Sequence, residues 1–321
     1  MGRNFRWCFI GAGGIAKITA KELVAEGGTI SSVWNRTHKR AERFAKRFNC
    51  TAYKNIDDAL NKEKVDAAYV NVIHPKHYDL ALKCIEKGIP VLCEKALTMN
   101  ANQARKLFEA AKEKNVYLAE AMWTWYSPVA KKVKEWIQNK EIGEIVYAKG
   151  SFSFPVLPFN RNPRLTKNEL GGGAILDLGV YPIRYAYELF GYPTGIRCKS
   201  RIKNKVDLDD EIKFEYQGFD VELFCSFTRL KGDYFVIKGT KGKIKVPFFQ
   251  ASHKAKLIGK RKETFSYKGK LYSNQFKEVE KEILSGSIEP KSVSKKGSID
   301  VMEIMDECRR QNGVVYKDDM F

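Results

Sequence analysis

A glycine-rich turn near the N-terminus is the first candidate for chemistry. In FIGAGGIAKITAKEL (residues 9–23), a short apolar run ends in glycines and a helical pattern follows. The hexamer GAGGIA fits the G-x-G-x-x-G/A pattern, whose glycines permit a tight turn and a close backbone approach to a pyrophosphate. The N-terminus of the next helix attracts phosphates. We therefore predict a dinucleotide site at Gly11, Gly13, Gly14 and Ile15, with a purely structural strand–helix turn as the alternative.

The end of the second predicted strand indicates which dinucleotide binds. NAD sites usually carry an Asp or Glu there, about twenty residues after the glycines, to accept from the ribose 2′-OH. This strand instead runs into Asn35 and Arg36, with Lys39 close behind and no carboxylate between them. Arg36 can bind a 2′-phosphate through two parallel hydrogen bonds. We expect NADP(H) as the preferred cofactor and NAD(H) as the second choice, unless Arg36 only begins a basic helix.

Two downstream stretches suggest proton chemistry. VLCEKALTMN places Glu94 and Lys95 at the carboxyl end of a predicted parallel strand, where doubly wound sheets form their ligand crevices. A second glycine run, GGGAILDLGVYP, precedes a predicted helix. Asp177, Tyr181 and Arg184 are spaced i, i+4 and i+7 in it, so one helical face holds all three. The alternative for Tyr181 is a core aromatic with a satisfied hydroxyl.

The first 120 residues alternate short apolar runs with amphipathic stretches, a pattern typical of βαβ units around a parallel sheet. Strands are predicted at 5–10, 29–34, 51–53, 66–73, 90–94 and 116–121. These runs are apolar nearly throughout, as strands covered on both faces must be. We predict an N-terminal Rossmann NAD(P)-binding domain over residues 1–122.

The pattern changes after about residue 125. Alternating segments joined by glycine-containing turns predict antiparallel hairpins, and helices are predicted at 127–138, 174–190, 272–285 and 298–311. The fold class is therefore α/β, with an α+β substrate and oligomerisation domain over 123–321 built on an open, mostly antiparallel sheet. The C-terminal helix near 298–311 is a candidate to pack back on the first domain.

Composition and charge exclude several classes of protein. The formal charge of +19 is dispersed along predicted helix faces, with short basic runs at 36–48, 256–270 and 291–298. This favours a solvated lysine-rich surface over a nucleic-acid partner. No apolar run reaches the roughly 18–20 residues that span a bilayer, so we expect no membrane partner and a cytoplasmic protein. Seven scattered cysteines without a CxxC pair predict neither a metal site nor a disulfide framework.

Taken together, the motifs resemble the Gfo/Idh/MocA oxidoreductase family nearly end to end. They are GAGGIA, residues 65–100, EAMWTWYSP (120–128), IGEI (142–145) and GGGAILDLGVYP. The chain is most similar to the branch containing dimeric dihydrodiol dehydrogenase, xylose dehydrogenases and glucose–fructose oxidoreductase. The resemblance implies hydride transfer between nicotinamide C4 and a secondary alcohol or carbonyl of a sugar or cyclic diol, carried out by a homodimer.

The resemblance also implies roles for individual residues. Lys95 matches the lysine of the family's Glu-Lys-Pro motif, which hydrogen-bonds the reacting oxygen, and Tyr181 matches the proton donor and acceptor. Asp177 matches the aspartate that binds or orients the substrate. Glu94 and Lys95 are also expected at the cofactor. His74 and His77 lie in a segment that lines the dinucleotide, so we expect them to pack against it.

The chain departs from the family pattern at two positions. Ala96 replaces the proline after the lysine, and Trp125 stands where branch relatives usually carry arginine. Candidate substrate contacts are Trp123, Trp125, Arg161 and Arg164, with a solvated loop as the alternative for the two arginines. The alternative function is a non-catalytic dinucleotide-binding sensor or scaffold. Retention of Lys95, Asp177 and Tyr181 together argues against it.

Overall fold

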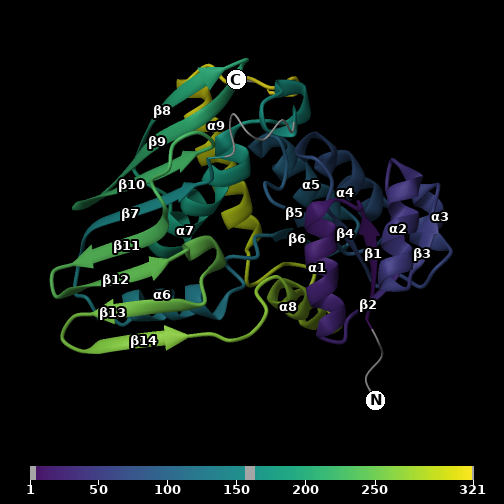
Figure 1. The fold of residues 1–321 in the computed structure, drawn as a ribbon, viewed down its shortest axis with the longest axis horizontal. Helices are drawn as coiled ribbons and strands as arrows, with labels where there is room; N and C mark the ends of the chain where they lie inside the picture. Colours follow the sequence, from purple (N-terminus) through teal and green to yellow (C-terminus); the bar gives the residue numbers. More distant parts are fainter. Residues whose placement is uncertain (1–4, 156–162, 320–321) are drawn as a thin grey trace. The chain divides into compact units, whose positions relative to one another are not determined.

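The computed structural model describes residues 5–155 and 163–319, which form two compact units (Figure 1). The first unit contains Met1–Thr98, Asn102–Trp123 and Lys270–Ser298, and the second contains Met99–Ala101, Thr124–Gly269 and Ile299–Phe321. The domain boundary after residue 122 stays a prediction. The structure adds that residues 270–298 pack with the first unit, although they follow the second unit's strands in the sequence.

The first unit is built on a six-stranded parallel sheet with the order β3-β2-β1-β4-β5-β6. Its strands are β1 (Arg6–Ile10), β2 (Thr29–Trp34), β3 (Thr51–Tyr53), β4 (Ala67–Val70), β5 (Val91–Glu94) and β6 (Leu118–Ala121). Its helices are α1 (Gly14–Ala25), α2 (His38–Phe48), α3 (Ile56–Asn61), α4 (His77–Glu86), α5 (Ala101–Glu113) and α8 (Ser273–Leu284). This confirms the predicted Rossmann sheet.

The burial of these strands explains their composition. All residues of β4, β5 and β6 are buried, as expected for parallel strands with helices on both faces. The strand order reverses between β1 and β4. In sheets of this type, ligands bind at such a reversal, beyond the carboxyl ends of the strands. The turns that follow β1, β4 and β5 are therefore the ones that can form a site.

The late helix α8 completes the core of the first unit. Phe276 packs edge-on against Trp7, with ring centroids 5.1 Å apart, and against Tyr69 at the same distance. The Trp7 indole donates a 2.6 Å hydrogen bond to Glu280 at the rim of this cluster. The predicted helix at 272–285 is confirmed, and its aromatic contacts explain why it belongs to the first unit.

The second unit is built on an eight-stranded sheet with the order β14-β13-β12-β11-β7-β10-β9-β8. Its strands are β7 (Ile145–Ser153), β8 (Gly195–Lys203), β9 (Val206–Tyr216), β10 (Phe219–Ser226), β11 (Asp233–Gly239), β12 (Gly242–Pro247), β13 (Lys254–Ile258) and β14 (Lys262–Ser266). All neighbouring strands are antiparallel except β7 and β10, which are parallel. The predicted open, mostly antiparallel sheet is confirmed, whereas the β13–β14 hairpin was not predicted.

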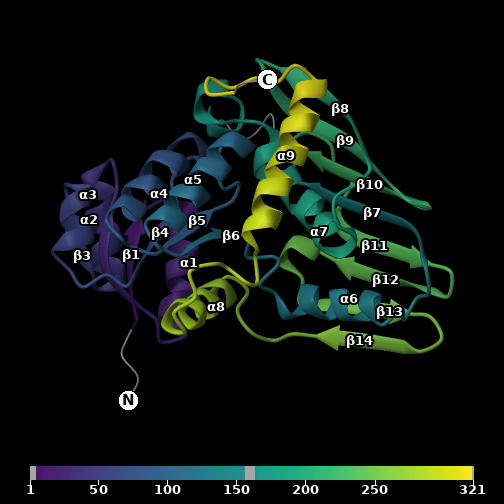
Figure 2. The same ribbon diagram turned by 180° about the vertical axis from the view of Figure 1, so that it is seen from behind.

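Three helices cover one face of this sheet, and the other face is open (Figures 1 and 2). They are α6 (Pro128–Gln138), α7 (Val180–Phe190) and the part of α9 (Lys295–Gln311) that belongs to the second unit. The packing of the C-terminal helix on the first domain stays a prediction.

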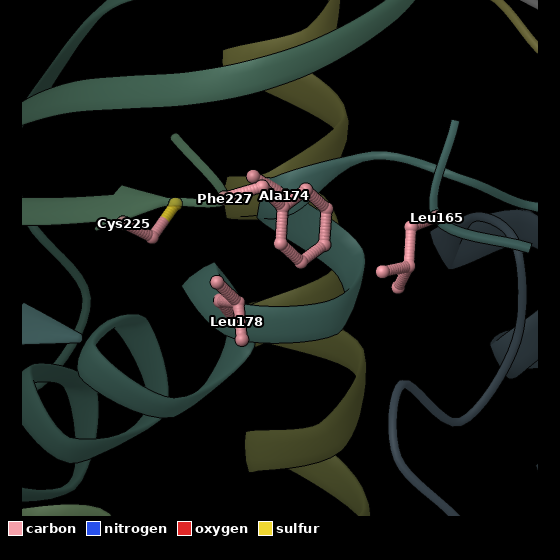
Figure 3. Packing of buried hydrophobic residues seen from close by; sticks show 5 residues of the cluster. All are labelled: Leu165, Ala174, Leu178, Cys225 and Phe227. Atoms are coloured by element: carbon pink, nitrogen blue, oxygen red, sulfur yellow. The ribbon is translucent and has the colours of Figure 1, made fainter. Parts of the chain in front are cut away.

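A buried cluster supports the turn that leads into α7. Leu165, Ala174, Leu178, Cys225 and Phe227 pack together there (Figure 3). The segment Ile175–Gly179 is a π-helical turn, and α7 continues from it at Val180. The continuous helix predicted at 174–190 is therefore two segments with different helical periods. Single π-helical turns of this kind often occur at functional sites.

Candidate functional site

The glycine turn after β1 is closed on one side by the neighbouring strand. Gly11 has φ +123°, which L side chains rarely adopt. A Cβ atom at this position would lie 2.5 Å from both the carbonyl oxygen and Oδ1 of Asn71, which follows β4. Gly11 also donates from its backbone N–H to the Trp34 carbonyl at 2.8 Å. Only glycine fits at this position.

The other side of the turn is open. Gly13 caps the N-terminus of α1, and among the described residues no side chain accepts from this end of the helix. The first turn of α1 contains no acidic residue, and a Cβ atom at Gly13 or Gly14 would meet nothing within 4 Å. Open space above uncapped N–H groups suits an anion. The turn therefore fits the pyrophosphate of a dinucleotide.

The end of β2 is tied to this turn by Asn35. Its side-chain oxygen accepts from the Ala12 N–H at 3.1 Å, and its amide group donates to the Thr37 carbonyl at 3.0 Å. Arg36 and Lys39 are exposed beside it, and within the described ranges neither forms an ion pair. Asn35 thus positions the backbone of the glycine turn, while Arg36 and Lys39 supply positive charge that can attract a 2′-phosphate.

The two predicted cofactor-packing histidines lie inside the first unit. The His77 ring is fully buried, with Nδ1 2.9 Å from the Ala96 carbonyl oxygen and Nε2 3.2 Å from that of Val72. Burial lowers the pKa of His77 to about 4, so the ring is neutral at neutral pH. His74 is buried beside it, with the ring centroids 5.5 Å apart. His77 therefore links the loop after β4 to the loop after β5.

Glu94 and Lys95 lie where β5 ends. Glu94 is only 5% exposed and accepts a short hydrogen bond from the hydroxyl of Tyr69 on β4. Burial raises the pKa of Glu94 to about 7, and the Tyr69 hydrogen bond and the Lys95 charge partly oppose this rise. Lys95 is half-buried, and the Lys95–Ala96 peptide bond is cis.

A second buried carboxylate holds the segment after Lys95. Glu120 on β6 accepts from the Leu97 N–H at 3.2 Å and from the Ser298 hydroxyl at 2.8 Å. The chain that carries Lys95 is thereby fixed on one side by the His77 ring and on the other by Glu120.

The remaining candidate residues belong to the second unit. Asp177 lies on the π-helical turn and forms a two-pronged ion pair with Arg164, at 3.1 and 3.2 Å. Tyr181 lies in the first turn of α7, is 7% exposed and packs edge-on against Phe152. The structure therefore joins two predicted residues, Arg164 and Asp177, that the sequence did not connect. Arg161 lies outside the described residues.

A buried aspartate closes the second glycine turn. Gly173 has φ +133°, and a Cβ atom there would lie 2.5 Å from Oδ1 of Asp207 on β9. The other carboxylate oxygen of Asp207 accepts from the Ile175 N–H at 2.6 Å, at the start of the π-helical turn. The backbone that carries Asp177 is thus held by a carboxyl group of the protein itself.

Both predicted tryptophan contacts are buried. Trp123 packs against Tyr272 in the first unit, with the rings tilted by 33° and their centroids 4.3 Å apart. Trp125 packs edge-on against Tyr185 in the second unit, and the Lys134 ammonium lies 5.4 Å from its ring. Their role as substrate contacts stays a prediction.

Sequence reasoning missed Tyr69, Glu120 and Asp207. Each lies in a strand, and its partner lies in another segment, so no local spacing connects the two. One signal in the sequence is a polar residue inside a strand. A polar group that is buried there needs a hydrogen-bond partner, so such a residue indicates a contact with another segment.

Two further properties concern the described part of the chain. It contains no group of three or more His, Cys, Asp or Glu side chains that could hold a metal ion. It also contains no helix whose length and hydropathy would allow it to cross a bilayer.

Comparison with known proteins places the chain among oxidoreductases. Residues 5–122 match the Gfo/Idh/MocA description "Oxidoreductase family, NAD-binding Rossmann fold", and residues 130–245 match the C-terminal domain of the same family. A trans-1,2-dihydrobenzene-1,2-diol dehydrogenase of Xenopus laevis is 30% identical over 97% of this chain and 99% of its own length.

Two other proteins extend the comparison. A D-xylose 1-dehydrogenase (NADP(+)) of Hypocrea jecorina is 28% identical over 98% of this chain and 93% of its own length. The structure of KijD10, a 3-ketoreductase from Actinomadura kijaniata in complex with NADP and TDP-benzene, superposes with a TM-score of 0.87. The superposition covers 96% of this chain and 98% of the KijD10 chain at 24% sequence identity. At this identity the likeness is one of fold.

Proposed function

Because this chain belongs to the Gfo/Idh/MocA oxidoreductase family, we propose that it is an NADP-preferring dehydrogenase or reductase. Its substrate is a sugar or cyclic diol, in which a secondary alcohol and a carbonyl are interconverted. The names of the relatives support this substrate class, since they include a diol dehydrogenase and a sugar dehydrogenase.

The cofactor is held by the first unit. The uncapped start of α1, with Gly13 and Gly14, takes the pyrophosphate, and Arg36 with Lys39 takes the 2′-phosphate. The NADP(+) named for the xylose dehydrogenase and the NADP in the KijD10 complex support this preference. NADP(H), when bound, supplies or accepts a hydride at nicotinamide C4.

The chain's own residues handle the oxygen and its proton. Lys95 donates a hydrogen bond to the reacting oxygen, and Asp177, oriented by Arg164, binds the substrate. A tyrosine with a reference pKa of about 10 is protonated at neutral pH. In the reductive direction Tyr181 therefore gives its proton to the carbonyl oxygen, and in the oxidative direction it takes that proton back.

One observation carries the proposal. Lys95 is half-buried and directly follows β5, next to the buried Glu94, which accepts from Tyr69. It lies at the carboxyl edge of a parallel sheet whose first turn is open to a phosphate. A half-buried lysine at this edge of a parallel sheet supports a role in ligand chemistry, because ligands of such sheets bind beyond the carboxyl ends of the strands.

Cofactor binding and turnover test the proposal separately. Fluorescence titration of the protein with NADPH and NADH should show tighter binding of NADPH. A panel of sugars and diols should then reveal turnover. Lys95→Met and Tyr181→Phe should each lower kcat at least about 100-fold while NADPH still binds. Tyr192→Phe, at an exposed tyrosine, is the matched control. Near-native rates in both variants would contradict the assigned roles.

We also propose that the protein is a homodimer formed through the open face of the second unit's sheet. That face contains a hollow of about 600 Å³ whose lining includes Tyr147, Arg197, Glu222, Phe224 and Tyr234. Light scattering after size exclusion should give about twice the 36.7 kDa mass of the chain. The cytoplasmic compartment stays a prediction that cell fractionation would check.

A further inference from the structure

Arg309, near the end of α9, is a buried cation that the proposed chemistry does not use. Its side chain is 1% exposed. Its guanidinium group donates to both carboxylate oxygens of Asp319, to a carboxylate oxygen of Asp306 and, at 3.1 Å, to the Met99 carbonyl. A buried charge is costly unless it is paired and hydrogen-bonded, so these partners are tightly coupled to Arg309. Three distant stretches of the chain therefore meet at this one side chain.

The first of these stretches is the end of the segment that carries Lys95. Met99 follows Lys95 by a few residues, and it belongs to the second unit although Lys95 belongs to the first. The Met99 carbonyl accepts from Arg309, and the next residue, Asn100, donates from its side-chain amide to Asp319 at 3.1 Å. Two hydrogen bonds inside the second unit thus hold the end of this segment.

The same cluster holds the second glycine turn through Tyr316. The Tyr316 N–H donates to Asp319 at 2.8 Å, and the Arg309 guanidinium carbon lies 4.8 Å from the centre of the Tyr316 ring. The Tyr316 hydroxyl donates a short hydrogen bond to the Gly172 carbonyl. A Cβ atom at Gly173 would lie 2.8 Å from this hydroxyl, so the turn and the tyrosine are in direct contact. We call Arg309, Asp319 and Tyr316 together the Arg309 latch.

The second glycine turn leads directly to the groups proposed to act on the substrate. The Gly173 carbonyl accepts from the Asp177 N–H at 3.4 Å, and Asp207 accepts from the Ile175 N–H at 2.6 Å. Tyr181 follows in the first turn of α7. A shift of the glycine turn would therefore carry Asp177 and Tyr181 with it.

We propose that the Arg309 latch positions the reacting groups, because it fixes the backbone shortly before Asp177 and Tyr181 and shortly after Lys95. This inference rests on the proposed function and assigns the positioning of its groups to residues far away in the sequence. A displacement of about 1 Å at a reacting group can cost about 100-fold in rate. The cofactor is held by the first turn of the first unit, so loss of the latch should lower turnover and leave NADPH affinity unchanged.

Tyr316→Phe is the mildest test of the latch. It removes the hydroxyl that reaches Gly172 and keeps the ring beside Arg309. In the reduction of a sugar or diol-derived carbonyl, kcat should fall about tenfold or more, and NADPH binding should stay within about twofold. The isotope effect on kcat with NADPH deuterated at C4 should equal or exceed that of the wild type, which places the loss in hydride transfer. A merely structural role would lower the unfolding temperature and leave the kcat of the folded protein unchanged.

Tyr216→Phe is the matched control. The Tyr216 hydroxyl also donates to a glycine carbonyl, that of Gly191 at 2.9 Å, and Gly191 is the residue at which α7 ends. This change removes the same kind of hydrogen bond at the other end of the same helix. The kcat of Tyr216→Phe should therefore equal that of the wild type.

Arg309→Lys tests the cation at the centre of the latch. It keeps the charge and removes the planar fork that reaches several acceptors at once. Its kcat should fall further than that of Tyr316→Phe, because both segments lose support. Arg310→Lys is the control, since Arg310 pairs with Glu307 on the exposed side of α9, at 2.7 and 2.8 Å. If Arg309→Lys does not fold, Tyr316→Phe alone decides the question.

Amide hydrogen exchange in the protein without cofactor or substrate gives a readout that needs no turnover. In Tyr316→Phe, peptides that cover residues 171–181 should exchange faster than in the wild type. In Arg309→Lys, peptides that cover residues 95–101 should do so as well. Tyr216→Phe should leave both sets of peptides unchanged.

The inference is overturned if Tyr316→Phe keeps the wild-type kcat, if its exchange at residues 171–181 is unchanged, or if Tyr216→Phe loses as much kcat. A wild type that turns over NADPH with its substrate, together with a Tyr316→Phe variant of equal rate, removes the role of the latch alone. A wild type that binds neither nucleotide, or turns over no sugar or diol, removes the proposed function, and this inference with it.

Discussion

The two glycine turns, one in each unit, each contain a glycine with a similar positive φ but have different surroundings. Gly11 and Gly173 have φ values of +123° and +133°, and a Cβ atom on either would lie 2.5 Å from an oxygen of a neighbouring strand or loop. The turns differ in the helix that follows. The start of α1 has no side-chain cap within the described ranges, whereas the Ile175 N–H is bonded to the buried carboxylate of Asp207.

The difference shows that a glycine run before a helix does not by itself indicate a ligand. In both turns glycine allows the backbone to pass close to another segment, and in both the helix start favours an anion. In the second unit the protein supplies the acceptor for the helix start from β9, as a carboxyl oxygen of Asp207. In the first unit no described side chain does so, which leaves the position for the phosphates of a ligand.

The largest expected effect comes from adding a methyl group at Gly11 or Gly173, where the backbone passes close to another segment. Gly11→Ala and Gly173→Ala combine an unfavourable φ with a forced contact, so each should lower the free energy of unfolding by about 3 kcal/mol or more. Gly27→Ala is the control, because Gly27 has φ +87° but would meet no atom within 4 Å. Denaturant unfolding measures all three. Equal costs at Gly11 and Gly27 would show that the contact with Asn71 does not matter.

Removal of the Asp207 carboxyl group should have the next largest effect. Asp207→Ala leaves the Ile175 N–H without its acceptor and should cost about 2–3 kcal/mol. Burial raises the pKa of Asp207 in the folded protein above its ordinary value of 3.8. Between the ordinary pKa and the raised pKa, the folded protein therefore binds more protons than the unfolded chain. Wild-type stability should then fall as pH rises from about 4, and Asp207→Asn should lack this fall. Parallel stability curves of the wild type and Asp207→Asn would contradict the assignment.

The smallest effect should be confined to ligand binding. Gly13→Ala adds a Cβ atom in open space, so the free energy of unfolding should change by less than about 1 kcal/mol. The same atom occupies the approach of a pyrophosphate, and NADPH affinity should fall at least about tenfold, or about 1.4 kcal/mol. Fluorescence titration measures this, and unchanged NADPH binding would remove the distinction between the two turns.

Much of the first unit could be predicted because its signals are local. The predicted strand at 29–34 coincides with β2, and the one at 51–53 coincides with β3, since each is a short apolar run bounded by turn residues. The placement of Glu94 and Lys95 at the end of β5 is confirmed for the same reason. Their roles in the reaction stay predictions.

The rest depends on contacts between distant segments or on weak patterns. The pair Arg164–Asp177 and the pair Tyr69–Glu94 form only after the chain has folded, and sequence spacing carries no trace of them. The sequence of the β13–β14 hairpin shows only a basic run, because its exposed positions are polar and few apolar residues mark its inner face. The π-helical turn at Ile175–Gly179 has no composition of its own.

The position of α8 has a consequence for how the protein is made. Phe276 and Glu280 complete the cluster around Trp7, yet they leave the ribosome after the whole second sheet has been synthesised. Domains usually fold in order as the chain emerges. Here part of the aromatic core of the nascent first unit stays uncovered until α8 has been synthesised, after all the strands of the second sheet. Chaperones that bind exposed aromatic surface therefore have a long interval in which to act on this chain.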